Sequence, residues 1–119
     1  MRRQLPRLLL LGLFAAPPAQ AGDVIRLTPG GSANFSLQEN VTTGYSWRID
    51  QSASRNLGIM SITDAGRSGA RRRMVGSPGV HHWNIRALKP GQAAIVFVYQ
   101  RPWEPAPVQT RSVEVEVAP

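Results

Sequence analysis

The chain has 119 residues, a formal net charge of +7 and no cysteine. This length fits a single domain. Because cysteine is absent, disulfides, thiol catalysis, iron–sulfur clusters and thiolate zinc sites are excluded. The positive charge does not indicate a nucleic-acid partner, because six of the arginines lie in two short segments, residues 2–7 and 71–73. A nucleic-acid binder would spread basic residues over one face, with aromatic residues for stacking.

The first 21 residues have the order of a secretory signal peptide. They begin with three arginines, continue with the apolar run 8–16 and end on small residues at Ala19 and Ala21. The run is about half of the roughly 20 residues that a membrane-spanning helix needs, so we expect cleavage after Ala21; an uncleaved anchor is the alternative. Cleavage leaves residues 22–119 as one exported domain, periplasmic or secreted, with a net charge of +4 and no membrane segment.

The rest of the chain has the pattern of short strands separated by turns. Apolar and polar residues alternate with period 2, and no segment has the period of a helix. Residues 93–100 are apolar on both faces and β-branched, which predicts a central strand, and Asp64–Gly66 are expected to be a turn. The expected strands are residues 23–29, 33–37, 45–50, 57–63, 71–75, 81–87, 93–100 and 112–117.

This pattern predicts an all-β domain. About seven strands in 98 residues favour an immunoglobulin-like antiparallel β-sandwich, with a small barrel as the alternative. The strand at 71–75 is expected at an edge, where positive charge discourages pairing with another chain.

Few residues suggest catalysis. His81 and His82 are adjacent, so in a strand their side chains point to opposite faces and cannot chelate one metal together. We expect one to pack in the core and the other to face water. The carboxylates are scattered, and the chain has no H-E-x-x-H, no G-x-S-x-G and no phosphate-binding glycine loop. We therefore expect a binding protein and not an enzyme, with no metal and no cofactor.

Three loops have a composition more specific than a simple connection between strands needs. They are "NVTTG" at 40–44, "GSPG" at 76–79 and "RPW" at 101–103. Each taken alone is compatible with an ordinary turn, and Trp103 could fold back onto the core. Loops at one end of a sandwich are its natural binding surface.

Together the three loops resemble the chagasin family of inhibitors of papain-like cysteine proteases. The family pattern is N-P-T-T-G-[YF]-x-W, then G-x-G-G, then R-P-[WF], on an immunoglobulin-like sandwich. This chain has N-V-T-T-G-Y-S-W from Asn40, G-S-P-G from Gly76 and R-P-W from Arg101, and the resemblance covers essentially the whole exported domain.

The resemblance implies reversible, non-covalent inhibition of a papain-like cysteine protease. The three loops would form a wedge that enters the protease cleft, with the first loop over the catalytic cysteine and histidine. Tyr45 and Trp47 would begin a core strand, and Trp103 is the expected hot spot. The protease-binding residues that the resemblance implies are Asn40, Thr42, Thr43, Gly44, Gly76, Gly79, Arg101, Pro102 and Trp103.

Two residues depart from the family pattern. Val41 replaces its proline, so the first loop gains an N–H and loses rigidity, and we expect modestly weaker binding. Pro78 replaces the first of the paired glycines, which removes a backbone donor and fixes φ near −65°. If the second loop pairs with the protease through main-chain hydrogen bonds, this substitution would remove one of them.

Two other functions stay open from the residues alone. An immunoglobulin-like adhesion or assembly module would bind through its sheet edges or faces, and Arg71–Arg73 would then matter more than the loops. A carbohydrate-binding sandwich would use Trp103 as a stacking platform. The sequence does not name the target protease, and a monomer is the expected state.

Overall fold

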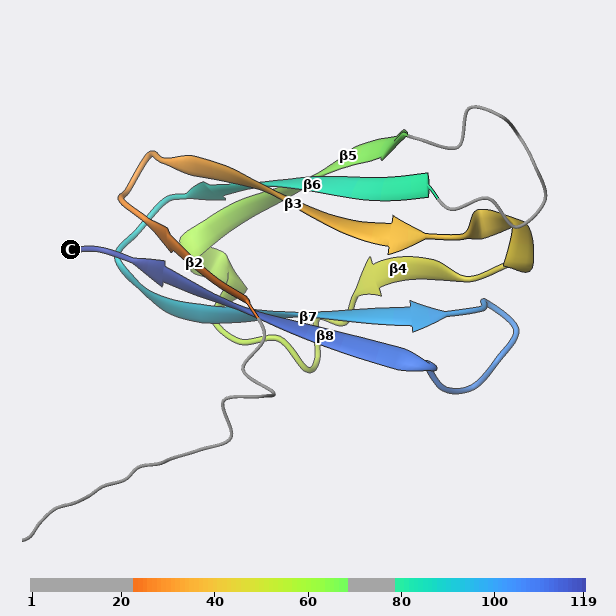
Figure 1. Cartoon of the computed structure of the whole chain (residues 1–119). Helices are drawn as coiled ribbons and strands as arrows, with labels where there is room; N and C mark the ends of the chain where they lie inside the picture. The colour runs from red at the N-terminus through yellow and green to blue at the C-terminus, as the bar shows by residue number, and fades with distance from the viewer. Residues whose placement is uncertain (1–22, 69–78) are drawn as a thin grey trace, which may run out of the picture.

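A computed structural model of the chain describes residues 23–68 and 79–119, which form two sheets facing each other (Figure 1). The expected signal segment 1–21, the expected strand 71–75 and the loop residues Gly76–Pro78 lie outside the described residues. In the described part, no helix is long and apolar enough to cross a membrane.

The described residues form seven strands, so the expected all-β sandwich of about seven strands is confirmed. One sheet has the order β2-β8-β7-β4, and the other has the order β3-β6-β5. The bounds of the first sheet are β2 (Asp23–Leu27), β8 (Gln109–Val117), β7 (Gly91–Gln100) and β4 (Ser46–Ile49). Those of the second are β3 (Ser32–Glu39), β6 (Gly79–Ala87) and β5 (Met60–Ser68).

One strand pairing is parallel. β2 runs beside β8 in the same direction, with Asp23 opposite Val113 and Leu27 opposite Val117, whereas the other strand pairs are antiparallel. Alternation of apolar residues shows which face of a strand is buried, but it carries no information on strand direction. The central position expected for residues 93–100 is confirmed, because β7 lies between β8 and β4.

Strand β5 corrects two expectations. Leu57–Ile59 form a short 3-10 helix, η4, and β5 begins only at Met60. The turn expected at Asp64–Gly66 is wrong, because β5 continues to Ser68 through a bulge at these residues. The carboxylate of Asp64 accepts a hydrogen bond of 2.8 Å from the Gly66 N–H, and Gly66 has a φ of +92°. A bulge therefore absorbs turn-forming residues without ending the strand.

The core lies between the two sheets and is centred on Phe97. Its ring stacks on Phe35 at 5.2 Å and is tilted against Trp83 at 4.7 Å. The two histidines point to opposite faces of β6, as expected. His81 is buried and stacks on Trp83 at 4.0 Å, while His82 is half-buried on the other face, with hydroxyl partners on β3 and β5.

Both the β3–β4 and the β7–β8 connections lie at one end of the sandwich (Figure 1). The C-terminus and the β2–β3 turn lie at the opposite end. The register of the strands thus brings residues 40–45 and 101–108 together, although about 60 positions separate them in sequence.

Candidate functional site

The first loop is a short turn organised by Asn40. Residues Val41–Thr43 form the 3-10 helix η3. The carbonyl oxygen of Asn40 accepts hydrogen bonds from the Thr43 N–H at 3.2 Å and from the Thr43 hydroxyl at 2.7 Å. The Thr42 hydroxyl donates to Asn40 Oδ1 at 2.7 Å, and the Asn40 N–H donates to the Tyr99 hydroxyl at 3.0 Å. The loop is therefore closed by its own bonds, while Thr42 and Thr43 remain exposed.

The third loop is fastened to the first by Arg101. Its Nε donates to the carbonyl oxygen of Thr43 at 2.9 Å, and its Nη1 lies 3.3 Å from Glu104 Oε2. The guanidinium carbon is 4.2 Å from the centre of the Tyr45 ring and 5.8 Å from that of Trp103. One side chain thus joins both loops by a hydrogen bond and by cation–π contacts.

Gly44 is where the two loops come closest. Its φ is +86°, a conformation that favours glycine. A Cβ at this position would lie 2.7 Å from the Trp103 ring, so only glycine lets the indole lie across the backbone. The Trp103 side chain does not fold onto the core, because 70% of the residue is exposed.

Aromatic residues support the first loop from below. Tyr99 of β7 stacks on Tyr45 at 5.2 Å and on Trp47 at 4.8 Å. Trp47 is buried, as expected for a core strand, and its indole N–H donates to the carbonyl oxygen of Gln38 at 2.8 Å. Tyr45 is half-buried and precedes β4. The loop is thus anchored on both of its flanks.

Of the remaining predicted residues, Gly79 lies beside the first loop and Pro102 lies within the third. Gly79 is the first residue of β6 and pairs with Glu39, so it lies beside the start of the first loop. Pro102 is exposed and lines a shallow hollow of about 270 Å³ with Ser46 and Arg48. Gly76 lies outside the described residues.

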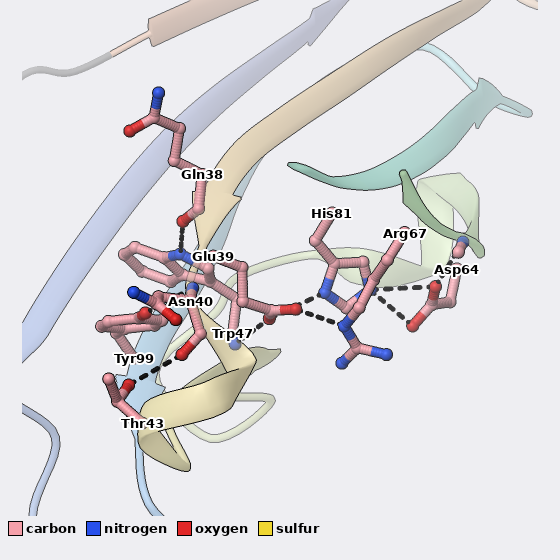
Figure 2. Close-up of polar contacts among 10 residues, drawn as sticks. Gln38, Glu39, Asn40, Thr43, Trp47, Asp64, Arg67, His81 and Tyr99 are labelled. Atoms are coloured by element: carbon pink, nitrogen blue, oxygen red, sulfur yellow. Dashed lines mark hydrogen bonds and ion pairs between the residues drawn. The ribbon is translucent and has the colours of Figure 1, made fainter. Parts of the chain in front are cut away.

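A polar cluster beside the first loop was not predicted from the sequence (Figure 2). Glu39 and His81 are buried, and their contacts reach Asp64 and Arg67 of β5. The cluster had a signal in the sequence, because Glu39 is in phase with the inward-facing Leu37. A carboxylate in a core position at the end of a strand indicates a buried partner.

The carboxyl groups of the cluster are shifted toward their charged forms. Burial raises the pKa of Glu39, but hydrogen bonds from the Trp47 N–H, Arg67 and His81 outweigh it and leave that pKa below its usual value. The Gly66 N–H and then His81 lower the pKa of Asp64. Among residues 23–68 and 79–119, no group of three or more His, Cys, Asp and Glu side chains could hold a metal ion.

The sequence profile described as "Chagasin family peptidase inhibitor I42" matches residues 26–117. This chain belongs to the chagasin family of peptidase inhibitors. It is 32% identical to Amoebiasin-1 of Entamoeba histolytica over 81 residues, which are 68% of this chain and 76% of that protein. The family resemblance stated from the three loops is thereby confirmed.

Solved structures have the same fold. The cysteine protease inhibitor EhICP2 from Entamoeba histolytica superposes with a TM-score of 0.64 at 20% identity, covering 83% of this chain and 88% of that chain. PbICP-C, solved in complex with falcipain-2, superposes with a TM-score of 0.61 at 23% identity, covering 80% and 88%.

Proposed function

We propose that this protein is a reversible, non-covalent inhibitor of papain-like cysteine proteases, and that a wedge built from the loops at 40–44, 76–79 and 101–103 occupies the protease cleft. One observation carries the proposal. Two loops distant in sequence meet at one end of the sandwich, where Arg101 joins them and Thr42, Thr43 and Trp103 face outward. Membership of a family of peptidase inhibitors supports it.

The bonding of the first loop suits a surface that covers a catalytic thiolate without being cleaved. A cysteine protease needs a carbonyl group within attack distance of its thiolate and correctly oriented. The carbonyl of Asn40 is held by two hydrogen bonds from Thr43, and the carbonyl of Thr43 is held by Arg101. These internal bonds fix the backbone, so the loop can exclude water while resisting the distortion that attack requires.

The links between the loops reduce the ordering cost of binding. A surface that is already in its bound conformation loses less conformational entropy when the partner arrives. Val41 deprives the first loop of the stiffness of proline, but three hydrogen bonds still close it. The Asn40 N–H donates to the Tyr99 hydroxyl, the Thr42 hydroxyl donates to Asn40 Oδ1, and Arg101 Nε donates to the Thr43 carbonyl. We expect an interface of roughly 1,600 Å² in total, the usual size for protease–inhibitor pairs.

Titration of papain with the domain 22–119 tests the proposal. Papain of known active-site concentration should lose activity at micromolar inhibitor or below, and regain it on dilution. Thr43→Asp and Trp103→Ala should each raise the inhibition constant by well over about tenfold, because a central charge or a lost hot spot costs about 2 kcal/mol. Thr28→Asp, in the exposed turn at the opposite end, is the matched control.

Full papain activity at micromolar wild-type protein would overturn the proposed function. Inhibition that Thr43→Asp and Trp103→Ala leave unchanged would instead overturn the wedge. Glycan binding that persists in Thr43→Asp would favour the carbohydrate-binding alternative, and partner binding lost on substitution of Arg71–Arg73 would favour an adhesion module.

The same proposal includes export. We expect residues 1–21 to be a cleaved signal peptide and the inhibitor to act in the periplasm or outside the cell, as a monomer without catalytic activity of its own. Mass spectrometry of the exported protein should give a chain that begins at Gly22, and sedimentation should give the mass of one domain. A chain that retains Met1 in the membrane fraction would contradict export.

A further inference from the structure

Glu39 joins the two ends of the first loop. It is the last residue of β3, directly before Asn40, and its side chain is 1% exposed. Its Oε2 accepts a hydrogen bond of 2.7 Å from the backbone N–H of Trp47, which lies beyond the loop in β4 (Figure 2). The separation between the entry and the exit of the loop therefore depends on where this carboxylate is held.

His81 holds Glu39 in place. Its Nδ1 lies 3.0 Å from Glu39 Oε2, and its Nε2 lies 2.9 Å from Asp64 Oδ2 on β5. Arg67, also on β5, pairs with the other oxygen of Glu39. Each ring nitrogen of His81 thus faces a carboxylate oxygen from a different strand.

Stability alone is a weak explanation for this cluster. A buried ionic group is often no more stabilising than apolar residues of similar volume, because its desolvation offsets its attraction. Glu39 occupies an inward position that continues Phe35 and Leu37 along β3, and His81 likewise continues Trp83 and Ile85 along β6. Apolar side chains occupy those positions in the rest of both strands, so the exception falls at the end that carries the loops.

We propose that Glu39 and His81 are positioning residues for the protease-binding loop Asn40–Gly44. By fixing Trp47 relative to the end of β3, the pair sets the conformation in which Thr42 and Thr43 are presented before any protease arrives. The proposal rests on the proposed function only for its effect on inhibition, since the conformation of the loop can be measured in the free protein.

Two variants test the pair. His81→Phe keeps a buried ring against Trp83 and removes both ring hydrogen bonds. Glu39→Gln keeps an oxygen that can accept the hydrogen bond from the Trp47 N–H, and it removes the negative charge that faces His81 and Arg67. It is the milder change and remains a test if His81→Phe fails to fold. The matched controls are His82→Phe on the outer face of β6 and Glu116→Gln in an exposed ion pair with Arg26.

The expected result has two parts. Amide hydrogen exchange at Thr43 and Trp47 of the free protein should be at least about fivefold faster in His81→Phe and Glu39→Gln, because loosening of the loop opens these bonds. The inhibition constant for papain should rise by about tenfold at a temperature where every variant is fully folded, because the loop is no longer preorganised for binding. The two controls should change neither quantity.

If both variants exchange the amide hydrogens of Thr43 and Trp47 at the wild-type rate, the positioning role is overturned, regardless of how the variants inhibit papain. Faster exchange with unchanged inhibition would also overturn it, because the loop conformation would then be irrelevant to binding. Failure of the wild-type protein to inhibit papain would count against the proposed function alone, since the exchange measurement needs no protease.

Discussion

At the scale of single residues, Gly44 has the most constrained role in the site. Its positive φ is unfavourable for any residue with a side chain, and a Cβ would meet the Trp103 ring at 2.7 Å. Gly44→Ala should therefore lower the free energy of unfolding by about 1–2 kcal/mol and displace the indole. We expect the inhibition constant for papain to rise even under conditions in which the variant is fully folded. Papain titration measures this effect, and urea unfolding measures the loss of stability.

Gly58→Ala is the matched control for this change. Gly58 lies in η4, it has no positive φ, and a Cβ there would meet nothing within 4 Å. This variant should keep both stability and inhibition. A Gly44→Ala protein that unfolds and inhibits like the wild type would show that the indole does not depend on the glycine.

At the scale of elements, Arg101 links the β3–β4 loop to the β7–β8 loop. Lysine can keep the charge near Glu104 and Tyr45, but it lacks the planar fork that also reaches the Thr43 carbonyl. Arg101→Lys should raise the inhibition constant by about tenfold, and the free energy of unfolding should change by less than about 1 kcal/mol because the pair is partly exposed. Papain titration and urea unfolding measure the two effects.

Arg26→Lys provides the comparison for Arg101→Lys. Arg26 is an exposed partner of Glu116 toward the opposite end of the sandwich, so its replacement should leave inhibition unchanged. Equal loss of inhibition in both variants would mean that general charge, and not the link between the loops, determines affinity.

The elements also show which features of the fold a sequence can predict. Alternation correctly predicted that His81 and His82 lie on opposite faces of one strand, with one of them in the core, because neighbouring side chains of a strand alternate between its faces. Strand direction and the bulge in β5 could not be predicted in this way. The parallel pairing of β2 depends on the path of the whole chain, and the bulge depends on a hydrogen bond between the Asp64 carboxylate and the Gly66 N–H.

The candidate site also has parts that the local sequence predicts and parts that depend on the folded chain. The first and third loops could be identified because their motifs are local runs of residues. The sequence indicates only that Glu39 needs a buried partner. It does not identify His81 and Asp64 as its partners, because these residues come from two other strands and meet Glu39 only after the sheet has formed. Scattered carboxylates in the sequence are thus adjacent in the fold.

At the scale of the whole molecule, the two ends of the sandwich are built differently. The β2–β3 turn is held by backbone bonds, such as that from the Gly30 N–H to the Ala87 carbonyl at 2.8 Å. The loop end depends on side-chain bonds to Glu39, Asn40 and Arg101. Backbone bonds form in any sheet, whereas the bonds made by Glu39 and Arg101 depend on ionised side chains. The loop end should therefore respond to pH more than the rest of the domain.

Acid should weaken the fold in part through this end. The pKa values of Glu39 and Asp64 are lowered in the folded protein. A carboxyl group of this kind contributes stability that is fully present above its unfolded pKa of about 4, and that contribution is lost as the pH falls through the folded pKa. The free energy of unfolding should thus decline from about pH 5 downward, measured by urea unfolding at a series of pH values.

Glu39→Gln identifies the group responsible. Glutamine does not titrate, so the variant should be less stable than the wild type at neutral pH but should lose less of its remaining stability between about pH 5 and pH 2. Glu116→Gln removes an exposed carboxylate instead, and exposed pairs contribute little, so its curve should run parallel to that of the wild type. If the Glu39→Gln curve also runs parallel, the buried carboxylate does not couple folding to pH, and the acid response of the domain arises elsewhere.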